Sequence, residues 1–479
     1  MAKDITTIIR ENNGLRFWTK AGIAVRMSLP AMLAQLTTIA MEYIDAAMVG
    51  SLGANASASI GLVSSSIWLV EGVIFAIIYG FSVQIAHSVG ADDEEQSAKI
   101  FRCGLIFSIL FNALIALLTF LISGHLPLWL GGDPAIAKDA SAYFLVMTVV
   151  LPITRIGFYC ASCIQATGNM KTPAILEASM CILDIIFNCF MIFPSGTKTF
   201  LGISFYLPGA GLGVAGAAWG TAIAEFIITG IMFYIAVRRT KYIRFKRHLK
   251  PEGTAHTSTY ALIIKKALKL AAPAAAQQIA ISGAMVMTTR IIAPLGSVSV
   301  AANSFAITAE SVCYMPGFGL QGAASTLVGQ SLGAQKNTQA KSFAWICTLL
   351  GMIIMALLGV IMYFLCPYVF QFLTPDPAVR QLAVTVLRIE LLAEPFYGAS
   401  IVAAGALRGA GDTLVPSILS FVSIWGVRVT LAFLLVRTYG LRGMWIAMAI
   451  ELTFRGLLFL ARLKFGKWQK SLAENPGQV

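Results

Sequence analysis

The sequence predicts an all-α, polytopic membrane protein made of two homologous halves. Hydrophobic residues make up 57% of the 479 residues and charged residues only 12%, and the mean hydropathy is +0.78. A soluble globular chain of this length would need more polar surface. The first half is also repeated: PAMLAQ at Pro30 reappears as PAAAQQ at Pro273, and Asp133 reappears as Asp376, both 243 residues later. Two such halves facing each other are typical of membrane transporter folds.

Apolar runs predict where the chain crosses the bilayer, because a spanning helix needs about 20 apolar residues. The runs predict twelve membrane-spanning helices, near residues 22–50, 57–86, 100–123, 141–165, 173–194, 212–237, 262–292, 300–330, 343–366, 380–405, 415–436 and 440–463. We therefore expect an N-lobe at 1–237, a cytoplasmic linker at 238–259 and a C-lobe at 260–479. The first half has a surplus of 16 residues at 195–210. We interpret this surplus as an extracellular hairpin or loop between helices five and six.

The net charge of +13 is better explained by membrane topology than by nucleic-acid binding. With the N-terminus inside, most cations fall in cytoplasmic segments: Lys3, Arg10, Arg16, Lys20, residues 238–250, Lys265, Lys266, Lys269, Lys336, Lys341 and residues 464–470. The opposite loops keep only Lys138, Lys198, Arg380, Arg437 and Arg442. This is the positive-inside pattern. We therefore expect a multi-pass protein of the cytoplasmic (inner) membrane with both termini in the cytoplasm and no nucleic-acid partner.

The sequence offers no residue pattern typical of an enzyme or a structural metal site. Cys160 and Cys163 lie within the fourth predicted helix, where small-residue packing explains them better than redox or zinc chemistry does. The acidic run that starts at Asp92 has the composition of a magnesium site. However, the equivalent run in the second half starts at Gln335 and carries no acid, so we interpret the acids as the first turn of a helix.

One group of polar residues within the predicted helices lies at a common depth. At 1.5 Å per residue, Asp45 lies about 10 Å, and Asp184 and Thr221 about 14 Å, below the outer ends of their helices. Asp184 and Asn188 share one face of helix five, as Ala217 and Thr221 do on helix six. Two carboxylates, an amide oxygen and a hydroxyl suit a sodium ion or a proton. The alternative is that Asp184 and Asn188 form only a structural hydrogen bond.

Five short motifs, in order along nearly the whole chain, are similar to those of a known family. They are Pro30 with Gln35, YIDAAMVGSLG at 43–53, IQATGNMKTP at 164–173, GAAWGT at 216–221 and GALRGAGDT at 405–413. Together with the repeat, they resemble the multidrug and toxic compound extrusion (MATE) transporters, in a prokaryotic form closer to the DinF-like and archaeal branch than to the NorM-like branch. The resemblance implies two six-helix lobes around a central cleft. It also implies export of organic cations and drugs in exchange for sodium or protons, without a further cofactor.

In the archaeal and DinF-like branch, the resemblance implies a coupling site in the N-lobe. The aspartate on helix one of that branch matches Asp45. Its threonine on helix six, with the backbone carbonyl one turn earlier, matches Thr221 and Ala217. Its Asn-x-x-x-Asp pair on helix five is inverted here, with Asp184 at the asparagine position and Asn188 at the aspartate position.

NorM-like members are instead expected to use acids of the C-lobe, one on helix seven and one on helix ten. Here helix seven carries no acid, and Tyr397 stands at the helix-ten position, which favours the N-lobe as the coupling site. Glu394 lies one turn from Tyr397, and Glu310 lies in helix eight. A second site at these three residues therefore stays open.

For the exported compound we expect a cleft that holds aromatic cations through dispersion and cation–π contacts. Its candidate residues are Gln35, Trp68, Glu71, Gln278, Met285 and Tyr314. Pro30 lacks an amide donor, so helix one should bend there most easily. Cation binding at Asp45 and Asp184 would then bend the helix and expel the compound.

Two other functions stay open. A lipid-linked-sugar flippase of the same superfamily would line its cleft with arginines for pyrophosphate, and the chain offers Arg155, Arg290, Arg388 and Arg428. A membrane-embedded lipid-modifying enzyme is a more distant alternative, for which the sequence offers no nucleophile and base. We expect the protein to act as a monomer.

Overall fold

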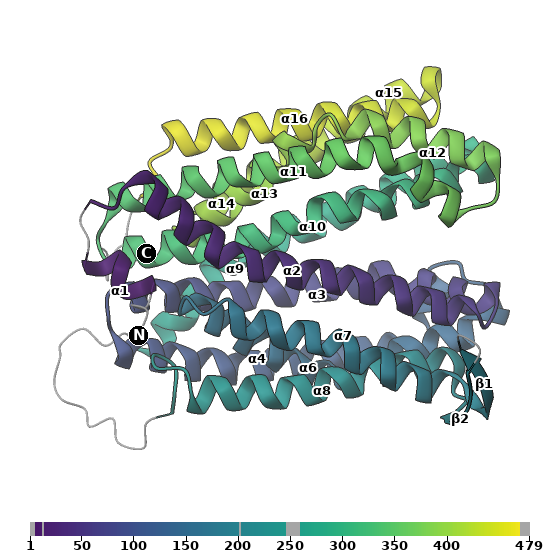
Figure 1. Cartoon of the computed structure of the whole chain (residues 1–479), viewed down its shortest axis with the longest axis horizontal. Coiled ribbons are helices and arrows are strands. Elements are labelled where there is room, and N and C mark those ends of the chain that lie inside the picture. Colours follow the sequence, from purple (N-terminus) through teal and green to yellow (C-terminus); the bar gives the residue numbers. More distant parts are fainter. Residues whose placement is uncertain (1–4, 12–13, 201–202, 246–258, 470–479) are drawn as a thin grey trace.

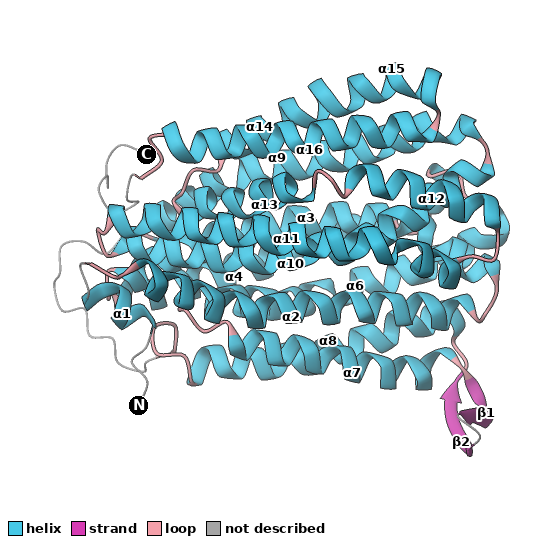
Figure 2. Ribbon diagram, turned by 45° about the horizontal axis from the view of Figure 1, so that its top comes forward, coloured by secondary structure: helices cyan, strands magenta, loops and turns pink. Residues whose placement is uncertain are grey.

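The computed structural model describes residues 5–11, 14–200, 203–245 and 259–469, and this part of the chain is almost entirely helical. Long helices run side by side along the long axis of the molecule (Figure 1). The short helix α1 lies at one end of the bundle, here called the α1 end. A β-hairpin lies at the other, here called the hairpin end (Figure 2). Within the described residues, ten helices are long and apolar enough to cross a membrane.

The first half forms eight helices and the hairpin. Their bounds are α1 Ile5–Glu11, α2 Phe17–Gly50, α3 Ala54–Gly90, α4 Glu94–Ile122, α5 Leu126–Trp129, α6 Pro134–Ala166, α7 Lys171–Ile192, β1 Pro194–Phe200, β2 Ile203–Ala210 and α8 Gly213–Arg238. All six helices predicted for this half are present as α2, α3, α4, α6, α7 and α8. The two short helices α1 and α5 were not predicted.

The second half repeats the arrangement with more irregular helices. Its elements are α9 Tyr260–Ile292, a 3₁₀ turn Ala293–Leu295, α10 Ser297–Gly333, α11 Asn337–Leu373, α12 Pro377–Glu390, α13 Glu394–Gly409, α14 Leu414–Phe421, a π-helical segment Val422–Val429, α15 Thr430–Tyr439 and α16 Leu441–Phe465. The prediction of one continuous tenth helix at 380–405 is wrong. The helix breaks between Glu390 and Glu394, because Pro395 follows the break and starts a new helix better than it continues one.

The repeat is visible in the geometry of the turns as well as in the sequence. Helix α10 begins and ends 243 residues after α3. Gly53 and Gly296, which precede these two helices, both have positive φ angles, of 117° and 91°. Asp92 and Gln335, which follow them, have φ angles of 60° and 58°, although side chains other than glycine rarely take this conformation. The two halves therefore share their helix boundaries and their unusual turns.

The two lobes share hydrophobic cores at the α1 end. Ile23 and Met27 at the start of α2 pack into the core of the second half, around Leu327 and Phe343. In the same way, the start of α9 packs into the core of the first half, through Ile263, Ala267 and Ala271. Near the hairpin end the cores are separate: one contains only residues of the second half, and two smaller ones contain only residues of the first. The lobes are therefore closed against each other at the α1 end.

Glycines and one histidine make the contact at the α1 end very close. A side chain at Gly90 would overlap the Gln330 carbonyl, and one at Gly333 would overlap the His87 carbonyl. His87 Nε2 lies 2.8 Å from the Gly409 carbonyl oxygen of the other lobe. The backbones of α3 and α10 thus touch where the two repeats cross.

Helix α1 binds both lobes across this contact. Arg10 forms an ion pair with Asp92 of the first half, while Lys336 of the second half donates to the carbonyls of Ile9 and Arg10, at 3.1 and 2.6 Å. Tyr242 also donates to Asp92 over 2.7 Å. Burial opposes ionisation of Asp92, but the hydrogen bonds from Tyr242 and Arg10 and the charge of Arg10 hold its pKa below the usual value.

The additional residues 195–210 of the first half, predicted as a hairpin or a loop, form a hairpin. Strands β1 and β2 pair antiparallel, with Pro194 opposite Ala210 and Thr197 opposite Tyr206, and the hairpin projects beyond the helices (Figure 2). The predicted linker at 238–259 begins where α8 ends. Residues 246–258 of that linker lie outside the described part of the chain.

Candidate cation-coupling site

The N-lobe brings together three polar residues from two helices. Asn188 Nδ2 on α7 donates to Asp45 Oδ1 on α2 over 2.8 Å and to Asp184 Oδ2 on α7 over 2.9 Å. Asp184 and Asn188 are completely buried, whereas Asp45 is half-buried. The structure thus brings α2 and α7, the predicted helices one and five, together at these residues. Asp184 and Asn188 do not form an isolated hydrogen-bonded pair, because Asn188 also donates to Asp45.

Helix α8 closes one side of this site. Gly216 and Gly220 have no room for a side chain, because a methyl group at Gly216 would overlap the Met191 carbonyl and one at Gly220 would overlap Asn188 Oδ1. Such small residues allow membrane helices to pack backbone to backbone. Thr221 follows and lies beside the Asp184 carboxyl group. Ala217 is buried one turn earlier, packed with Val49 and Ile192.

The site keeps unsatisfied acceptors. Asp184 Oδ1 and Asn188 Oδ1 are buried and accept no well-aligned hydrogen bond. A buried acceptor without a donor costs about 1–3 kcal/mol. These two oxygens are therefore available to bind a proton or a cation.

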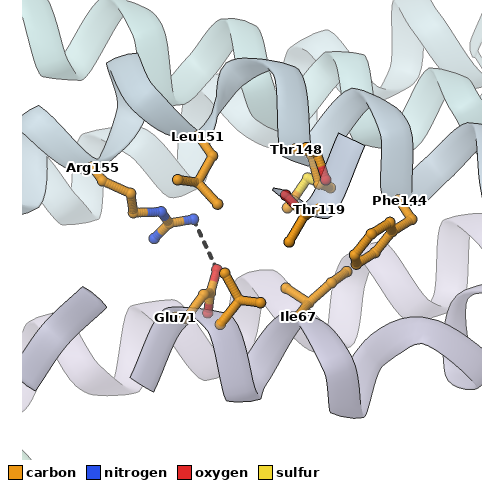
Figure 3. A pocket seen from close by; sticks show the side chains of 9 residues that line it. Ile67, Glu71, Thr119, Phe144, Thr148, Leu151 and Arg155 are labelled. Atoms are coloured by element: carbon orange, nitrogen blue, oxygen red, sulfur yellow. Dashed lines mark hydrogen bonds and ion pairs between the residues drawn. The ribbon is translucent and has the colours of Figure 1, made fainter. Parts of the chain in front are cut away.

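A second N-lobe cluster lies beside a pocket between α3, α4 and α6. Arg155 Nη2 is 2.8 Å from Glu71 Oε1 and 3.7 Å from Glu225 Oε1. The pocket is lined by Ile67, Val70, Glu71, Thr119, Phe144, Met147, Thr148, Leu151 and Arg155. Figure 3 shows Arg155 pointing along the pocket to Glu71, with Ile67 and Phe144 farther along. Of the predicted substrate residues, Glu71 is the one that lines this pocket.

The other predicted substrate residues are spread over both lobes. Gln278 on α9 packs directly on Gly72 of α3, beside Glu71. Tyr314 on α10 contacts the Tyr397 ring, with 5.6 Å between the ring centroids. The remaining three are not brought to the pocket: Trp68 and Met285 have exposed fractions of 50% and 57%, and Gln35 is half-buried with no hydrogen bond to a described residue.

Helix α2 continues as one helix through Pro30, the residue at which bending is predicted to be easiest. Gly319 of α10 has no room for a side chain because the backbone at Ala31 and Met32 lies against it. The proline turn is therefore held by the opposite lobe.

The C-lobe buries a larger group of charges. Glu451 is completely buried and binds Arg428 over 2.7 Å, Arg455 over 3.2 Å and the Ser423 hydroxyl over 2.7 Å. Ser423 and Arg428 both come from the π-helical segment Val422–Val429. A π-helical turn re-aims side chains and is frequent at functional sites.

Three further glutamates lie near these arginines. Glu310 is 3% exposed and lies within electrostatic reach of Arg428 and Arg455. Glu390 and Glu394 are fully buried and close to Glu310. None of the four carboxyl oxygens of Glu390 and Glu394 has a hydrogen-bond partner among the described residues.

Tyr397 belongs to the same cluster. Its ring faces Arg455, with 5.3 Å from the guanidinium to the ring centroid. The three residues of the predicted C-lobe site, Glu310, Glu394 and Tyr397, therefore do lie together. The sequence reasoning missed Glu390, Glu451 and the two arginines as members, although charged residues within apolar helices were the available signal.

The described residues contain no group of three or more histidine, cysteine, aspartate or glutamate side chains arranged to hold a metal ion. Cys160 and Cys163 are buried free thiols within a hydrophobic core. This placement agrees with the packing role predicted for them.

Comparison with known proteins shows the same repeat. A sequence model of the MatE family matches the chain twice, at residues 30–190 and 273–434. A relative from Thermotoga maritima, described as a probable multidrug resistance protein NorM, is 26% identical over 448 residues, which cover 93% of this chain and 92% of that protein. Its name gives no support to the predicted DinF-like or archaeal branch.

Two solved structures have the same fold. A MOP-superfamily transporter from Pyrococcus furiosus, reported to have a binding pocket of reversed polarity, has a TM-score of 0.85 at 18% identity, covering 97% of this chain and 99% of that one. The Vibrio cholerae MATE transporter VcmN in its bent form has a TM-score of 0.81 at 18% identity, covering 95% and 99%. The predicted architecture of two helical lobes is confirmed.

Proposed function

Because the chain belongs to the MatE family, we propose that it is a secondary antiporter that exports organic cations, including drugs, across the bacterial inner membrane in exchange for a coupling cation. The observation that carries the proposal is the bridge from Asn188 to Asp45 and Asp184. Carboxyl groups at bilayer depth are costly and usually functional. The name of the Thermotoga maritima relative, a multidrug resistance protein, supports the substrate class.

We propose a proton as the coupling ion. The NH₂ group of Asn188 points at both carboxylates, so it fills the position from which an amide oxygen would bind sodium. Two carboxyl groups around one donor can instead share a proton, because like charges this close are not both easily ionised. Sodium coupling would require the amide of Asn188 to turn over.

Alternating access would use the two lobes as rigid halves. The shared cores at the α1 end and the separate cores near the hairpin end support a conformation that opens at the hairpin end. The positive-inside pattern assigns the α1 end to the cytoplasm, so this would be the outward-facing state. Protonation of Asp45 and Asp184 would remove charge from the N-lobe and permit closure.

The C-lobe is proposed to carry protons as well. Arg428 and Arg455 are both engaged by Glu451, which leaves Glu310, Glu390 and Glu394 without a matching number of cations. An unpaired buried carboxylate costs several kcal/mol, so neutral acids are the favoured form. Their full burial argues that they exchange protons only when the lobe rearranges.

The flippase alternative is less well supported. Arg155 and Arg428 are bound to glutamates, and Arg388 donates to the Tyr363 carbonyl over 3.2 Å and faces its ring. Arginines engaged in this way are poorly placed to receive a pyrophosphate. The enzyme alternative gains no nucleophile and base from the described residues.

The test is ethidium export by the monomeric protein in proteoliposomes, with proton and sodium gradients imposed separately. We expect the proton gradient alone to drive export and Asp45→Asn and Asp184→Asn to abolish it. Export driven only by sodium would overturn the choice of ion. Export that survives both substitutions would overturn the N-lobe site, and movement of a lipid-linked sugar in place of ethidium would favour the flippase.

A further inference from the structure

Glu42 is an exposed carboxyl group on a membrane-spanning helix. It lies eight residues before the end of α2, about 12 Å from that end. No described residue forms a hydrogen bond or ion pair with it, yet it is within electrostatic reach of Glu71 on α3 and of Tyr314 on α10. A bare charge facing lipid would be expensive. Glu42 therefore faces the space between the lobes, beside Glu71.

Glu71 is paired with Arg155, which is shared with Glu225 and uses only part of its hydrogen-bonding capacity. Arg155 uses a single nitrogen, Nη2, for both of its glutamates, and its distances to Glu71 and Glu225 differ by almost 1 Å, at 2.8 and 3.7 Å. Arg155 Nε is buried and has no acceptor. A guanidinium held at one nitrogen has not reached the two-bond geometry that makes arginine–carboxylate pairs strong. Arg155 can therefore move from one glutamate to the other at little cost.

The charges around Arg155 are strongly unbalanced. The ionisable side chains linked through this cluster are Glu42, Asp45, Glu71, Asp184, Glu225 and Arg155. Among the described residues, this linked group holds five carboxyl groups and one guanidinium, and the guanidinium lies next to Glu71 and Glu225. Unsaturated negative charge of this kind attracts a second cation.

We propose that Glu42 and Glu71 together bind the cationic group of the exported compound, and that Arg155 is the internal cation which the compound displaces from Glu71. The inference deepens the proposed function and rests on it for the class of compound. The side chain of Glu71 is 25% exposed and that of Arg155 only 6%, so an incoming cation reaches Glu71 from the open side while Arg155 holds it from the buried side.

Displacement of Arg155 connects the compound to the coupling site. Once released from Glu71, the guanidinium pairs fully with Glu225, which lies within electrostatic reach of Asp184. Its positive charge then favours loss of a proton from the Asp45–Asp184 pair. The compound and the proton compete without touching each other, and Arg155 acts as a positioning residue between them.

The geometry also selects among cations. Glu71 accepts a hydrogen bond from the Arg155 guanidinium at 2.8 Å, so the best competitor is a cation with N–H donors, such as an amidinium, a guanidinium or a protonated amine. A cation without donors, such as tetraphenylphosphonium, gains only the charge interaction. Compounds of the first kind should displace Arg155 more effectively.

The experiment uses the purified full-length chain in detergent and the fluorescent diamidine DAPI. Binding is followed by fluorescence, and proton release by a pH-sensitive dye in weak buffer. We expect Glu42→Gln to weaken DAPI binding about tenfold, as for the loss of one charge-assisted contact, with a smaller loss for tetraphenylphosphonium. Arg155→Gln should bind DAPI more tightly and release no proton on binding. Arg155→Lys keeps the charge and should still release one.

Glu177→Gln is the matched control, because Glu177 lies on α7 two turns from Asp184 and outside this cluster. Unchanged DAPI affinity in Glu42→Gln, or weaker affinity in a folded Arg155→Gln variant, would overturn the proposal. If Arg155→Gln does not fold, loss of proton release in Arg155→Lys would overturn it. DAPI binding that depends on Glu42 without export under any gradient would refute the antiporter and leave the binding site standing. Export that is unchanged in Glu42→Gln would refute the proposed binding site and leave the antiporter function standing.

Discussion

The N-lobe and the C-lobe are built on one helical frame, yet they bury charge at different positions of it. Glu310, Glu390 and Glu394 of the C-lobe correspond, 243 residues earlier, to Ile67, Met147 and Leu151. These three residues line the N-lobe pocket. The same positions therefore form part of the apolar wall of a pocket in one lobe and a glutamate cluster in the other.

The N-lobe aspartates likewise have no charged counterparts in the C-lobe. Asp45 and Asp184 of the N-lobe correspond to Thr288 and Val427 of the C-lobe. Helix ends and crossing glycines are shared between the repeats, because both halves must pack in the same way. The charges are not shared, so each lobe has its own chemistry, and symmetry alone cannot transfer a site from one to the other.

The two sites also differ in access. Asp45 is half-buried and bound to an amide, whereas Glu390 and Glu394 are sealed from solvent and have no hydrogen-bond partner. A half-buried acid can exchange protons in the present conformation. A sealed acid cannot, so the N-lobe should respond first to an imposed gradient.

The largest effect should come from removing charge in the N-lobe. Asp184→Asn is expected to reduce proton-driven ethidium export to the level of liposomes without protein, because the Asn188 bridge then joins only one carboxyl group. The matching change in the other lobe, Glu394→Gln, should leave export clearly measurable. If Glu394→Gln were the more damaging of the two, the roles assigned to the lobes would have to be exchanged.

The next effect concerns stability. Glu451→Gln leaves the buried Arg455 and the partly buried Arg428 without their shared carboxylate, which should cost up to about 3–5 kcal/mol of unfolding free energy. Thermal unfolding of the detergent-purified protein should show a lower Tm than for Glu177→Gln. A Tm equal to that of the control would mean that the arginines find other partners among the glutamates nearby.

A triple substitution can transfer the N-lobe residues to the C-lobe. The triple change Glu310→Ile, Glu390→Met and Glu394→Leu places the N-lobe residues on the C-lobe frame. It removes four buried oxygens without partners, each of which costs about 1–3 kcal/mol, so we expect a higher Tm. Export should continue through the N-lobe with fewer protons moved per compound, measured as the ratio of proton to ethidium flux. An unchanged ratio would remove the C-lobe from coupling.

The smallest effect lies at the α1 end, where the pKa of Asp92 is lowered in the folded protein. The resulting stabilisation is present above the unfolded pKa of about 3.9 and is lost as the pH falls through the lower folded value. Because Asp92 is 46% exposed, it contributes at most about 1 kcal/mol. Asp92→Asn should speed amide hydrogen exchange in α1 at pH 7 and leave α16 unchanged. Equal exchange in α1 would show that Asp92 does not hold the helix in place.

The sequence predicted the helical frame well because apolar length and the repeat are local properties of the chain. It named Asp45, Asp184 and Asn188, which the structure brings together, but not that Asn188 would donate to both carboxyl groups, since this depends on how α2, α7 and α8 meet. The break before Glu394 was missed because the apolar pattern continues through it. The sequence offered Arg428 and Arg455 as possible partners of the C-lobe glutamates, but it could not assign them to Glu451, because the π-helical turn that places Arg428 cannot be recognised from hydrophobic periodicity.

The bridge made by α1 has a consequence for the order in which the molecule is completed. Lys336, which binds the carbonyls of Ile9 and Arg10, is synthesised more than 300 residues after them. During that interval Ile9, which is 1% exposed in the finished protein, has no core to enter. Helix α1 can therefore dock only after α10 has been inserted. Its docking requires parts of both halves to be in the membrane.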